Sequence, residues 1–316
     1  MNFFFIFIII CILASILYIV NKCLSHRDNF VDNSSLYKNS NLLIAARRLS
    51  DLANHYKFGG YPDTYPSKDG ETIFVKVDNI QEFVDNYLPN IKYKFVLVSG
   101  ESDYTLPDHS VDSFNTIRKH PLLIKWYLQN YNENPNDKDD RLKHYPIGLD
   151  FHTLSSNPLW GPIQTPEEQE NDINTVKKLI KFENRLSKCY SNFHFFLSGK
   201  YCYDRQNAID QIPKDLIYYE PTKIDRIESW KNMIKHKFVV SPLGNGIDCH
   251  RTWEALALGC IPIVKKSPLD PLYNGLPVII VNEWSDVTQD LLDSYNSEGT
   301  SLEKMYMKYW YNEFNI

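Results

Sequence analysis

The sequence predicts an α/β protein made of two units with parallel sheets, preceded by one N-terminal transmembrane helix. Short apolar runs alternate with amphipathic segments along residues 41–316, a proline-rich break divides that stretch, and an uncharged apolar segment opens the chain. Alternation of that type is typical of parallel strands covered by helices. We expect the two units to enclose a cleft, because open α/β sheets bind ligands beyond the carboxyl ends of their strands.

Composition excludes several classes of protein. Hydrophobic residues make up 43% of the 316 residues, which suffices for packed cores and argues against a disordered chain. The formal net charge is −5 with both signs well mixed, so no basic stripe marks a nucleic-acid-binding protein. Six cysteines lack zinc-site spacing, and a bridge between Cys189 and Cys202 is the alternative to buried free thiols. We expect neither nucleic acid nor a bound metal.

The first segment of the chain predicts a membrane anchor. Phe3 to Val20 contains no charge and is just long enough to cross a hydrocarbon core of about 30 Å as a helix. The rival reading is a cleaved secretory signal, but a basic start and a small-residue cleavage site are not clear here. Lys22 and Arg27 favour a cytosolic body, whereas a glycosylation triplet at Asn33 suits the lumen of the secretory pathway. We therefore predict a single-pass signal anchor and leave its orientation open.

Periodicity places the remaining elements. We expect an anchor at 1–21, a juxtamembrane stem at 22–40, an N-terminal acceptor domain at 41–154, a linker at 155–166 and a C-terminal donor-binding domain at 167–316. In the first domain we expect strands at 72–77 and 95–98, a third strand ending at 146–148, and helices at 42–55, 80–88 and 113–129. In the second we expect strands at 193–197, 216–219, 238–240, 261–264 and 278–281, and helices at 167–182, 205–211, 225–236, 248–258, 286–295 and 302–314.

One segment, residues 238–264, predicts a binding site for a negative group. It reads as an apolar strand, a loop with Pro242, Gly244 and Gly246, a helix, and a second strand. Glycines let the backbone approach a ligand closely, and the free N–H groups at a helix start favour a diphosphate. Asp248 is a good N-cap residue for this helix. The segment therefore predicts one βαβ turn that holds phosphate.

Polar residues of the same helix suit a nucleoside diphosphate. Arg251 and Glu254 are three apart and share one helix face. Arg251 suits phosphate oxygens, Glu254 can accept hydrogen bonds from ribose hydroxyls, and His250 can donate to a phosphate or to the sugar. The alternative is that Arg251 and Glu254 form a surface pair and that the glycines only turn the chain.

The same segment resembles the donor motif of exostosin-type glycosyltransferases. The resemblance rests on F-x-V-x-P-x-G over 238–244, on Asp248, Arg251 and Glu254-Ala255, and on the run 259–264. It implies two Rossmann-like domains in a GT-B-like arrangement, a nucleotide sugar held mainly by the second domain, an inverting transfer and no obligatory metal. Many relatives carry a small hydroxyl residue before the arginine helix, where this chain has Asp248-Cys249-His250.

Two shorter stretches are similar to other parts of that family. An apolar run, Gly199 and Arg205 resemble the opening of the donor domain, which would make Arg205 a second phosphate ligand; a solvated helix arginine is the alternative. Residues 146–150 resemble the segment that crosses between the domains, which would bring Asp150 and His152 near the cleft. Tyr273 and Trp284 are minor candidates for stacking on a base or sugar, since aromatics at strand ends more often pack.

An inverting transfer needs a general base for the acceptor hydroxyl. Glu101 and Asp103 lie in an acidic loop directly after an apolar strand, a usual position for catalytic groups. Asp150 and His152 are the other candidate pair, and His109 is a more distant one. We predict a membrane-anchored glycosyltransferase that moves a sugar from a nucleoside-diphosphate donor to a glycan or other hydroxyl acceptor, without a cofactor.

Two other functions compete with this prediction. A non-catalytic, membrane-tethered protein that binds nucleotide sugars or glycans could keep the same fold. A nucleotide-sugar epimerase would be expected to carry a glycine fingerprint after its first strand, and residues 98–105 lack one. Turnover of a nucleotide sugar separates the transferase from the tethered binder.

Overall fold

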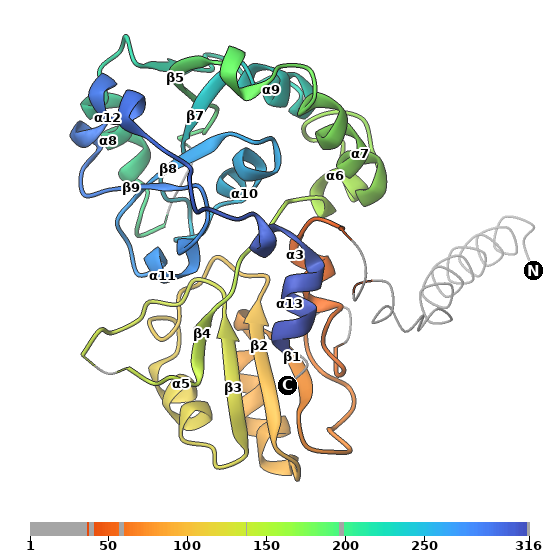
Figure 1. The fold of residues 1–316 in the computed structure, drawn as a ribbon. Helices are drawn as coiled ribbons and strands as arrows, with labels where there is room; N and C mark the ends of the chain where they lie inside the picture. Colours follow the sequence, from red (N-terminus) through yellow and green to blue (C-terminus); the bar gives the residue numbers. More distant parts are fainter. Residues whose placement is uncertain (1–36, 38–40, 57–59, 137, 196–198, 315–316) are drawn as a thin grey trace, which may run out of the picture. The chain divides into compact units, whose positions relative to one another are not determined.

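Two parallel sheets, one of four strands and one of five, dominate the structure (Figure 1). The computed structural model describes residues 37, 41–56, 60–136, 138–195 and 199–314. These sheets and their helices confirm the predicted α/β class and are consistent with two Rossmann-like domains. Among the residues described, no helix is long and apolar enough to cross a membrane. The predicted anchor at 1–21 lies outside them.

The four-stranded sheet follows the order of the chain. All its neighbours are parallel, with Phe74 opposite Val98 in register. Its strands are nearly continuous runs of buried apolar side chains, as expected for a parallel sheet covered on both faces. The strands are β1 (Glu71–Lys76), β2 (Phe95–Gly100), β3 (Leu123–Leu128) and β4 (Leu142–His144). Its helical elements are α3 (Ala46–Ser50), η1 (Val77–Asn79), α4 (Ile80–Glu82), η2 (Phe83–Tyr87), η3 (Leu88–Asn90) and α5 (Val111–Arg118).

Two predictions in this half are wrong. The predicted helix at 113–129 ends at Arg118, and β3 follows it. Pro121 disfavours a helical residue before it, and the apolar run after it is a buried strand that periodicity alone cannot distinguish from a helix. The end predicted for the next strand, at 146–148, is also wrong, because this strand, β4, ends at His144 and the chain then leaves the sheet. Gly148 has a φ of 68° there, and a Cβ on it would approach the Ala45 backbone to 3.1 Å.

The five-stranded sheet is wound in both directions from β5. Its order is β6-β5-β7-β8-β9 and all neighbours are parallel. Since β6 and β7 lie on opposite sides of β5, the chain reverses direction at the β5–β7 junction, where open α/β sheets bind ligands. The strands are β5 (Leu186–Ser191), β6 (Ile217–Tyr219), β7 (His236–Val240), β8 (Ile261–Lys265) and β9 (Ile279–Val281).

Helices cover both faces of this sheet. One face packs on α8 and α12, and the other packs on α7, α9 and α10, so each face has its own apolar layer. A capping box of Thr165 and Glu168 starts α7. The helical elements are α6 (His152–Ser156), α7 (Pro166–Val176), η4 (Phe182–Asn184), α8 (Asp204–Gln211), α9 (Arg226–Met233), α10 (His250–Ala257), α11 (Asp270–Tyr273), η5 (Trp284–Asp286), α12 (Gln289–Ser294), η6 (Glu303–Met305) and α13 (Met307–Phe314).

The predicted strand at 193–197 is wrong, because β5 ends at Ser191 and Phe193 lies beyond it. Residues 196–198 lie outside the described residues. The prediction failed because the strand itself contains Ser187 and Lys188, whereas the aromatic run that follows has the stronger apolar signal. Phe193 is fully buried, but beneath polar side chains at the strand end and not in the sheet.

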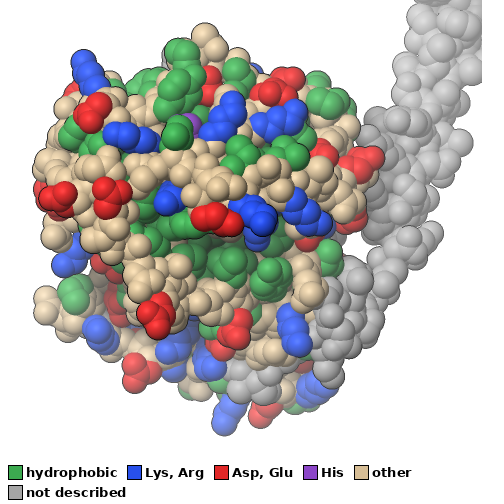
Figure 2. Space-filling view, turned by 45° about the horizontal axis from the view of Figure 1, so that its top comes forward, with side chains coloured by type: hydrophobic (Ala, Val, Ile, Leu, Met, Phe, Trp, Pro, Cys, Tyr) green, Lys and Arg blue, Asp and Glu red, His purple; other side chains and the backbone are tan. Residues whose placement is uncertain are grey.

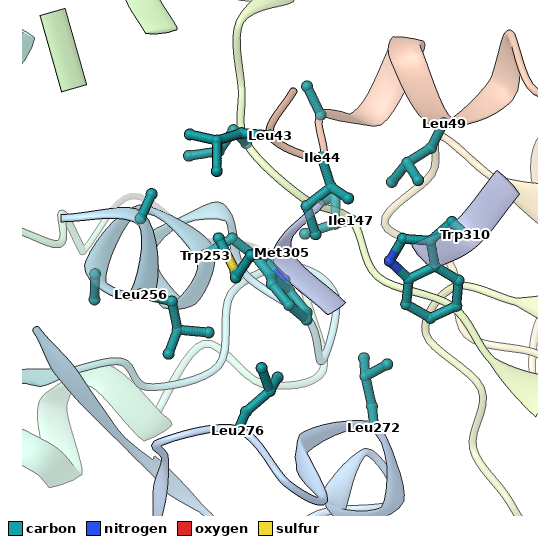
Figure 3. Close-up of a cluster of buried hydrophobic side chains, with 14 of the residues drawn as sticks. Leu43, Ile44, Leu49, Ile147, Trp253, Leu256, Leu272, Leu276, Met305 and Trp310 are labelled. Carbon is teal, nitrogen blue, oxygen red and sulfur yellow. The ribbon is translucent and has the colours of Figure 1, made fainter. Parts of the chain in front are cut away.

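One apolar core lies between the helices of the second sheet and the first half of the chain. Figure 3 shows Trp253 of α10 and Met305 near Ile44 and Ile147. The last helix, α13, packs beside the first sheet (Figure 1), where Tyr127 Oη donates to the Glu313 carbonyl at 2.7 Å. Residues from both ends of the described chain therefore complete the same core.

We expect Trp310→Ala to destabilise the protein by about 3–5 kcal/mol, since it opens a cavity in this core. Urea unfolding followed by circular dichroism measures the change. Lys308→Ala on the exposed side of the same helix is the control and should stay within about 0.5 kcal/mol of wild type. Equal losses in the two variants would show that α13 does not contribute to the core.

Candidate functional site

A cleft of about 770 Å³ lies at the carboxyl ends of β1 and β2. Loops 199–201 and 245–250 of the second half form its other wall. Five of the predicted site residues line it: Glu101, Asp103, His152, Gly199 and His250. The remaining predicted residues do not line the cleft: Asp150, Arg205, Pro242, Gly244, Gly246, Asp248, Arg251 and Glu254.

The acidic loop after β2 forms the first wall. Glu101 has a φ of 53°, and its carboxylate accepts a hydrogen bond from Ser50 Oγ at 2.6 Å. Its N–H donates to Gln129 Oε1 at 2.8 Å, which fixes the turn. Asp103 is exposed, and Asn245 Nδ2 lies 3.4 Å from its Oδ2 across the cleft. Glu101 is thus held rigidly against α3, whereas Asp103 contacts the loop of the opposite wall.

Asp150 and His152 form a carboxylate–imidazole pair at the crossing segment. His152 Nδ1 lies 3.1 Å from Asp150 Oδ1, and the same oxygen accepts from the Thr153 N–H at 3.0 Å. Asp150 is buried, whereas the His152 ring is about one-third exposed and lines the cleft. Burial raises the pKa of Asp150, but His250, His152 and Arg226 together hold it below its usual value. An ionised carboxylate therefore lies 3.1 Å from the imidazole, but the contact does not have the geometry of a hydrogen bond, because His152 Nδ1 is without a hydrogen-bond partner among the described residues.

His250, the first residue of α10, also contacts the crossing segment. Its Nδ1 lies 2.7 Å from the Gly148 carbonyl. Because a carbonyl only accepts, Nδ1 carries the hydrogen and Nε2 is the other functional nitrogen. Burial lowers the pKa of His250, and Asp150 opposes this. The ring lies 6.0 Å from that of His152, so two imidazoles share one part of the cleft wall.

Arg205 and Arg251 meet at the carboxyl end of β5. Both guanidinium carbons lie over the Phe193 ring, at 5.9 and 5.3 Å from its centroid. Arg205 is buried and donates to the Leu243 and His194 carbonyls at 3.2 and 2.6 Å. Burial lowers its pKa. It is therefore not the solvated helix arginine that was the alternative.

Arg251 has an unsatisfied nitrogen in this position. Its Nε donates to Asn192 Oδ1 at 2.8 Å, but Nη1 is buried without a hydrogen-bond partner in the described chain. Burial, with the neighbouring Arg205, lowers the pKa of Arg251 to about 10, so both side chains remain cationic at neutral pH. Neither arginine forms an ion pair with a carboxylate of the described residues, and Arg251 does not pair with Glu254. Two desolvated positive charges without a counterion favour a bound anion.

The glycine loop lies directly over these arginines. The Gly244 N–H donates to the Gly246 carbonyl at 3.1 Å, which closes a tight turn after Pro242. A Cβ on Gly244 would lie 3.1 Å from Cys249 Sγ and 3.4 Å from Arg205 Nη2. Glycine therefore leaves room for the Cys249 thiol and the Arg205 guanidinium, and a side chain here would press on Cys249 Sγ first.

Asn130, which sequence analysis missed, joins this loop to the first half. It is fully buried after β3 with a φ of 53°. Its Oδ1 accepts from the Asp248 N–H at 2.8 Å, and its Nδ2 donates to the Ser102 carbonyl at 2.9 Å. A Cβ on Gly246 would lie 2.6 Å from Asn130 Nδ2, so a larger residue would break this contact. The only sequence signal was an Asn at a strand end, a residue type that tolerates positive φ.

The predicted N-cap role of Asp248 is wrong. Cys249 occupies the N-cap position of α10, without a side-chain cap. The Asp248 carboxylate is buried and accepts from the Ile147 N–H at 2.7 Å and from Trp253 Nε1 at 2.9 Å. The Asp248 side chain points into the protein because the Ile147 N–H of the crossing segment offers it a hydrogen bond there. It holds α10 to the first half and does not reach a ligand directly.

Glu254 lies one turn deeper in α10 and is buried. Burial raises its pKa, while Arg226, whose Nε is 3.9 Å from Glu254 Oε1, acts in the opposite direction. Trp230 Nε1 is another buried donor without a hydrogen-bond partner among the described residues. The end of β5, α9 and α10 thus presents buried donors without hydrogen-bond partners, Arg251 Nη1 and Trp230 Nε1, near a buried carboxylate.

The minor aromatic candidates pack in the core. Trp284 is fully buried and donates from Nε1 to Asp204 Oδ1 at 2.9 Å, and Tyr273 lies in the core beside Trp253. The cysteines at 189, 202, 249 and 260 are free thiols, so the alternative bridge is absent. Within the described ranges no three His, Cys, Asp or Glu side chains are placed to hold a metal ion.

Charges of both signs are interspersed on the face of the protein in Figure 2. This distribution agrees with the mixed charge of the sequence. No protein-family model matches this chain, and no curated protein matches it. The chemistry of the site therefore rests on its own geometry.

The buried Asp248 carboxylate should make stability depend on pH. Burial raises its pKa to about 7, whereas an unfolded Asp titrates near pH 4. The native state therefore holds the proton more tightly, and this contribution to stability is lost as the pH rises from about 4 through 7. We expect urea unfolding to show a loss between about pH 5 and pH 8 that is about 1–3 kcal/mol smaller in Asp248→Asn than in wild type. Parallel pH profiles would contradict this assignment.

Replacing Arg251 with Met should change stability by less than about 1 kcal/mol, because its guanidinium is desolvated without a counterion. Arg48→Met is the comparison, since Arg48 is buried against the Glu170 carboxylate and its loss leaves that charge unpaired. We expect Arg48→Met to cost about 3–5 kcal/mol in urea unfolding. A similar loss in Arg251→Met would assign Arg251 a structural role.

Proposed function

We propose that this protein is a membrane-anchored, GT-B-like glycosyltransferase that uses a nucleoside-diphosphate sugar. The observation that carries the proposal is the pair of guanidiniums of Arg205, which is buried, and Arg251, whose buried Nη1 has no hydrogen-bond partner; within the described ranges neither forms an ion pair with a carboxylate. They lie at the β5–β7 junction, next to a glycine turn and the amino end of α10. A diphosphate supplies the negative charge and the acceptor oxygens that this position lacks. The resemblance of residues 238–264 to the exostosin donor motif supports the same function.

The roles of the other donor residues follow from their positions. Gly244 and Gly246 allow the backbone to approach the diphosphate, and His250, whose Nδ1–H is used by the Gly148 carbonyl, can accept from a sugar hydroxyl through Nε2. Glu254 is suited to the ribose hydroxyls, because a carboxylate oxygen has two lone pairs and the Arg226 Nε is as far as 3.9 Å from Oε1. The uncharged segment from Phe3 to Val20 supports the anchor, which would tether the catalytic body to a membrane.

His152 is the best candidate for the general base. Its ring lines the cleft, and the Asp150 carboxylate lies 3.1 Å from its Nδ1. The imidazole would take the proton from an acceptor hydroxyl while that oxygen attacks the anomeric carbon and the bond to the diphosphate oxygen breaks. One displacement of this kind inverts the anomeric centre. Arg205 and Arg251 would stabilise the charge that develops on the departing diphosphate, and Glu101 and Asp103 on the facing wall would hold the acceptor.

Binding and turnover should depend on Arg251. We expect full-length protein in detergent to release diphosphate from one member of a panel of uridine, guanosine, adenosine, cytidine and thymidine diphosphate sugars. Arg251→Met should bind that nucleotide about 1.5–3 kcal/mol more weakly, since it loses charge-assisted hydrogen bonds. Isothermal titration calorimetry measures the affinity, and Lys308→Met, which removes an exposed charge that does not line the cleft, should bind as wild type.

The outcomes separate the competing functions. Wild-type affinity in Arg251→Met would remove Arg251 from the site. Binding without turnover across the panel and a set of glycan acceptors would favour the tethered binding protein. Neither binding nor turnover with any member would refute the proposed donor class.

A further inference from the structure

Arg226, the first residue of α9, is buried where several segments meet. Its Nη1 donates to the Asp150 carbonyl at 2.5 Å and to Gln169 Oε1 at 3.0 Å, and its Nη2 donates to Asp150 Oδ2 at 3.3 Å. Its Nε lies 3.9 Å from Glu254 Oε1. The guanidinium carbon lies 4.7 Å from the centroid of the Trp160 ring, which belongs to the predicted linker. Arg226 therefore connects the crossing segment to α7, α9 and α10.

The geometry of this contact determines where the Asp150 carboxylate points. Arg226 binds both the carbonyl and the Oδ2 atom of the same residue, so backbone and side chain are fixed together. The other carboxylate oxygen, Oδ1, then faces His152 Nδ1 at 3.1 Å and the Thr153 N–H at 3.0 Å. A lysine ammonium cannot form the same set of hydrogen bonds, because it lacks the planar arrangement of donors of a guanidinium.

We propose that Arg226 is a positioning residue that holds Asp150 against His152 and thereby keeps the imidazole oriented toward the cleft. Its catalytic consequence rests on the proposed transferase function, but the orientation of His152 does not. The same guanidinium lies 3.9 Å from Glu254 Oε1. Arg226 therefore also connects the Asp150–His152 pair to a residue proposed to bind the donor. Gln169 stabilises the arrangement from α7, where its Nε2 donates to the Phe151 carbonyl at 2.8 Å.

The orientation of His152 can be tested without a substrate. Diethyl pyrocarbonate modifies neutral imidazoles, and mass spectrometry gives the rate at His152 relative to the exposed His109. We expect Arg226→Lys to lower that rate by about threefold or more, because an imidazole that is no longer held beside the Asp150 carboxylate spends less time with its other nitrogen facing the cleft, where the reagent reaches it. Asp150→Asn should lower it equally, and the double variant should show no further loss, since both changes break one interaction.

Arg185→Lys is the matched control. Arg185 is also buried, but it donates to the Leu258 and Gly259 carbonyls at the opposite end of α10. We expect this variant to keep the wild-type rate at His152 even if it loses thermal stability. An unchanged rate in Arg226→Lys, losses that add in the double variant, or an equal loss in Arg185→Lys would overturn the proposal.

Turnover gives a second readout if a donor is found. For that donor, kcat of Arg226→Lys should fall by about tenfold or more, while the donor KM stays within about threefold of wild type. A rise in KM with unchanged kcat would show that Arg226 acts on donor binding and not on His152. Absence of turnover in wild type would refute the transferase, whereas the modification rates would still decide the role of Arg226.

Discussion

The site depends on two positive charges, on buried Arg205 and partly buried Arg251, that form no ion pair with a carboxylate of the described chain. Arg205 and Arg251 converge on Phe193 at the end of β5, and their hydrogen bonds go to carbonyls and to Asn192. Such an arrangement is unfavourable by itself, because desolvated charge needs compensation. The fold tolerates it because the surrounding sheet and helices pack well, and the resulting positive potential is what an anionic ligand would neutralise.

The two halves of the described chain are joined by polar contacts as well as by the shared core. Asn130 binds the backbone of Asp248, Asp248 binds the backbone of Ile147, and His250 binds the Gly148 carbonyl. All these bonds converge on the start of α10. The first half therefore fixes where that helix begins, and with it the orientation of the residues that face the cleft.

Local pattern gave the α/β class and most strands, because apolar runs of a parallel sheet are visible in sequence. Prediction from local pattern failed at β3, because one apolar run fits either a helix or a strand. It also failed at β5, because the aromatic run around Phe193 has a stronger apolar signal than the strand before it. In the site, the phosphate-suited arginines were found through glycine and helix-start signals. Asn130, Asn192 and Arg226 were missed, since their roles arise only from contacts between distant segments.

The last helix, α13, covers part of the four-stranded sheet, which precedes it by most of the described sequence. Tyr127 Oη donates to the Glu313 carbonyl, and Thr72 Oγ1 donates to the Phe314 carbonyl at 3.3 Å. These partners are separated by most of the described chain, so the first sheet remains uncovered at this position until residues 307–314 have left the ribosome. The amino-terminal half therefore cannot reach its complete packing before the last residues of the described chain are available.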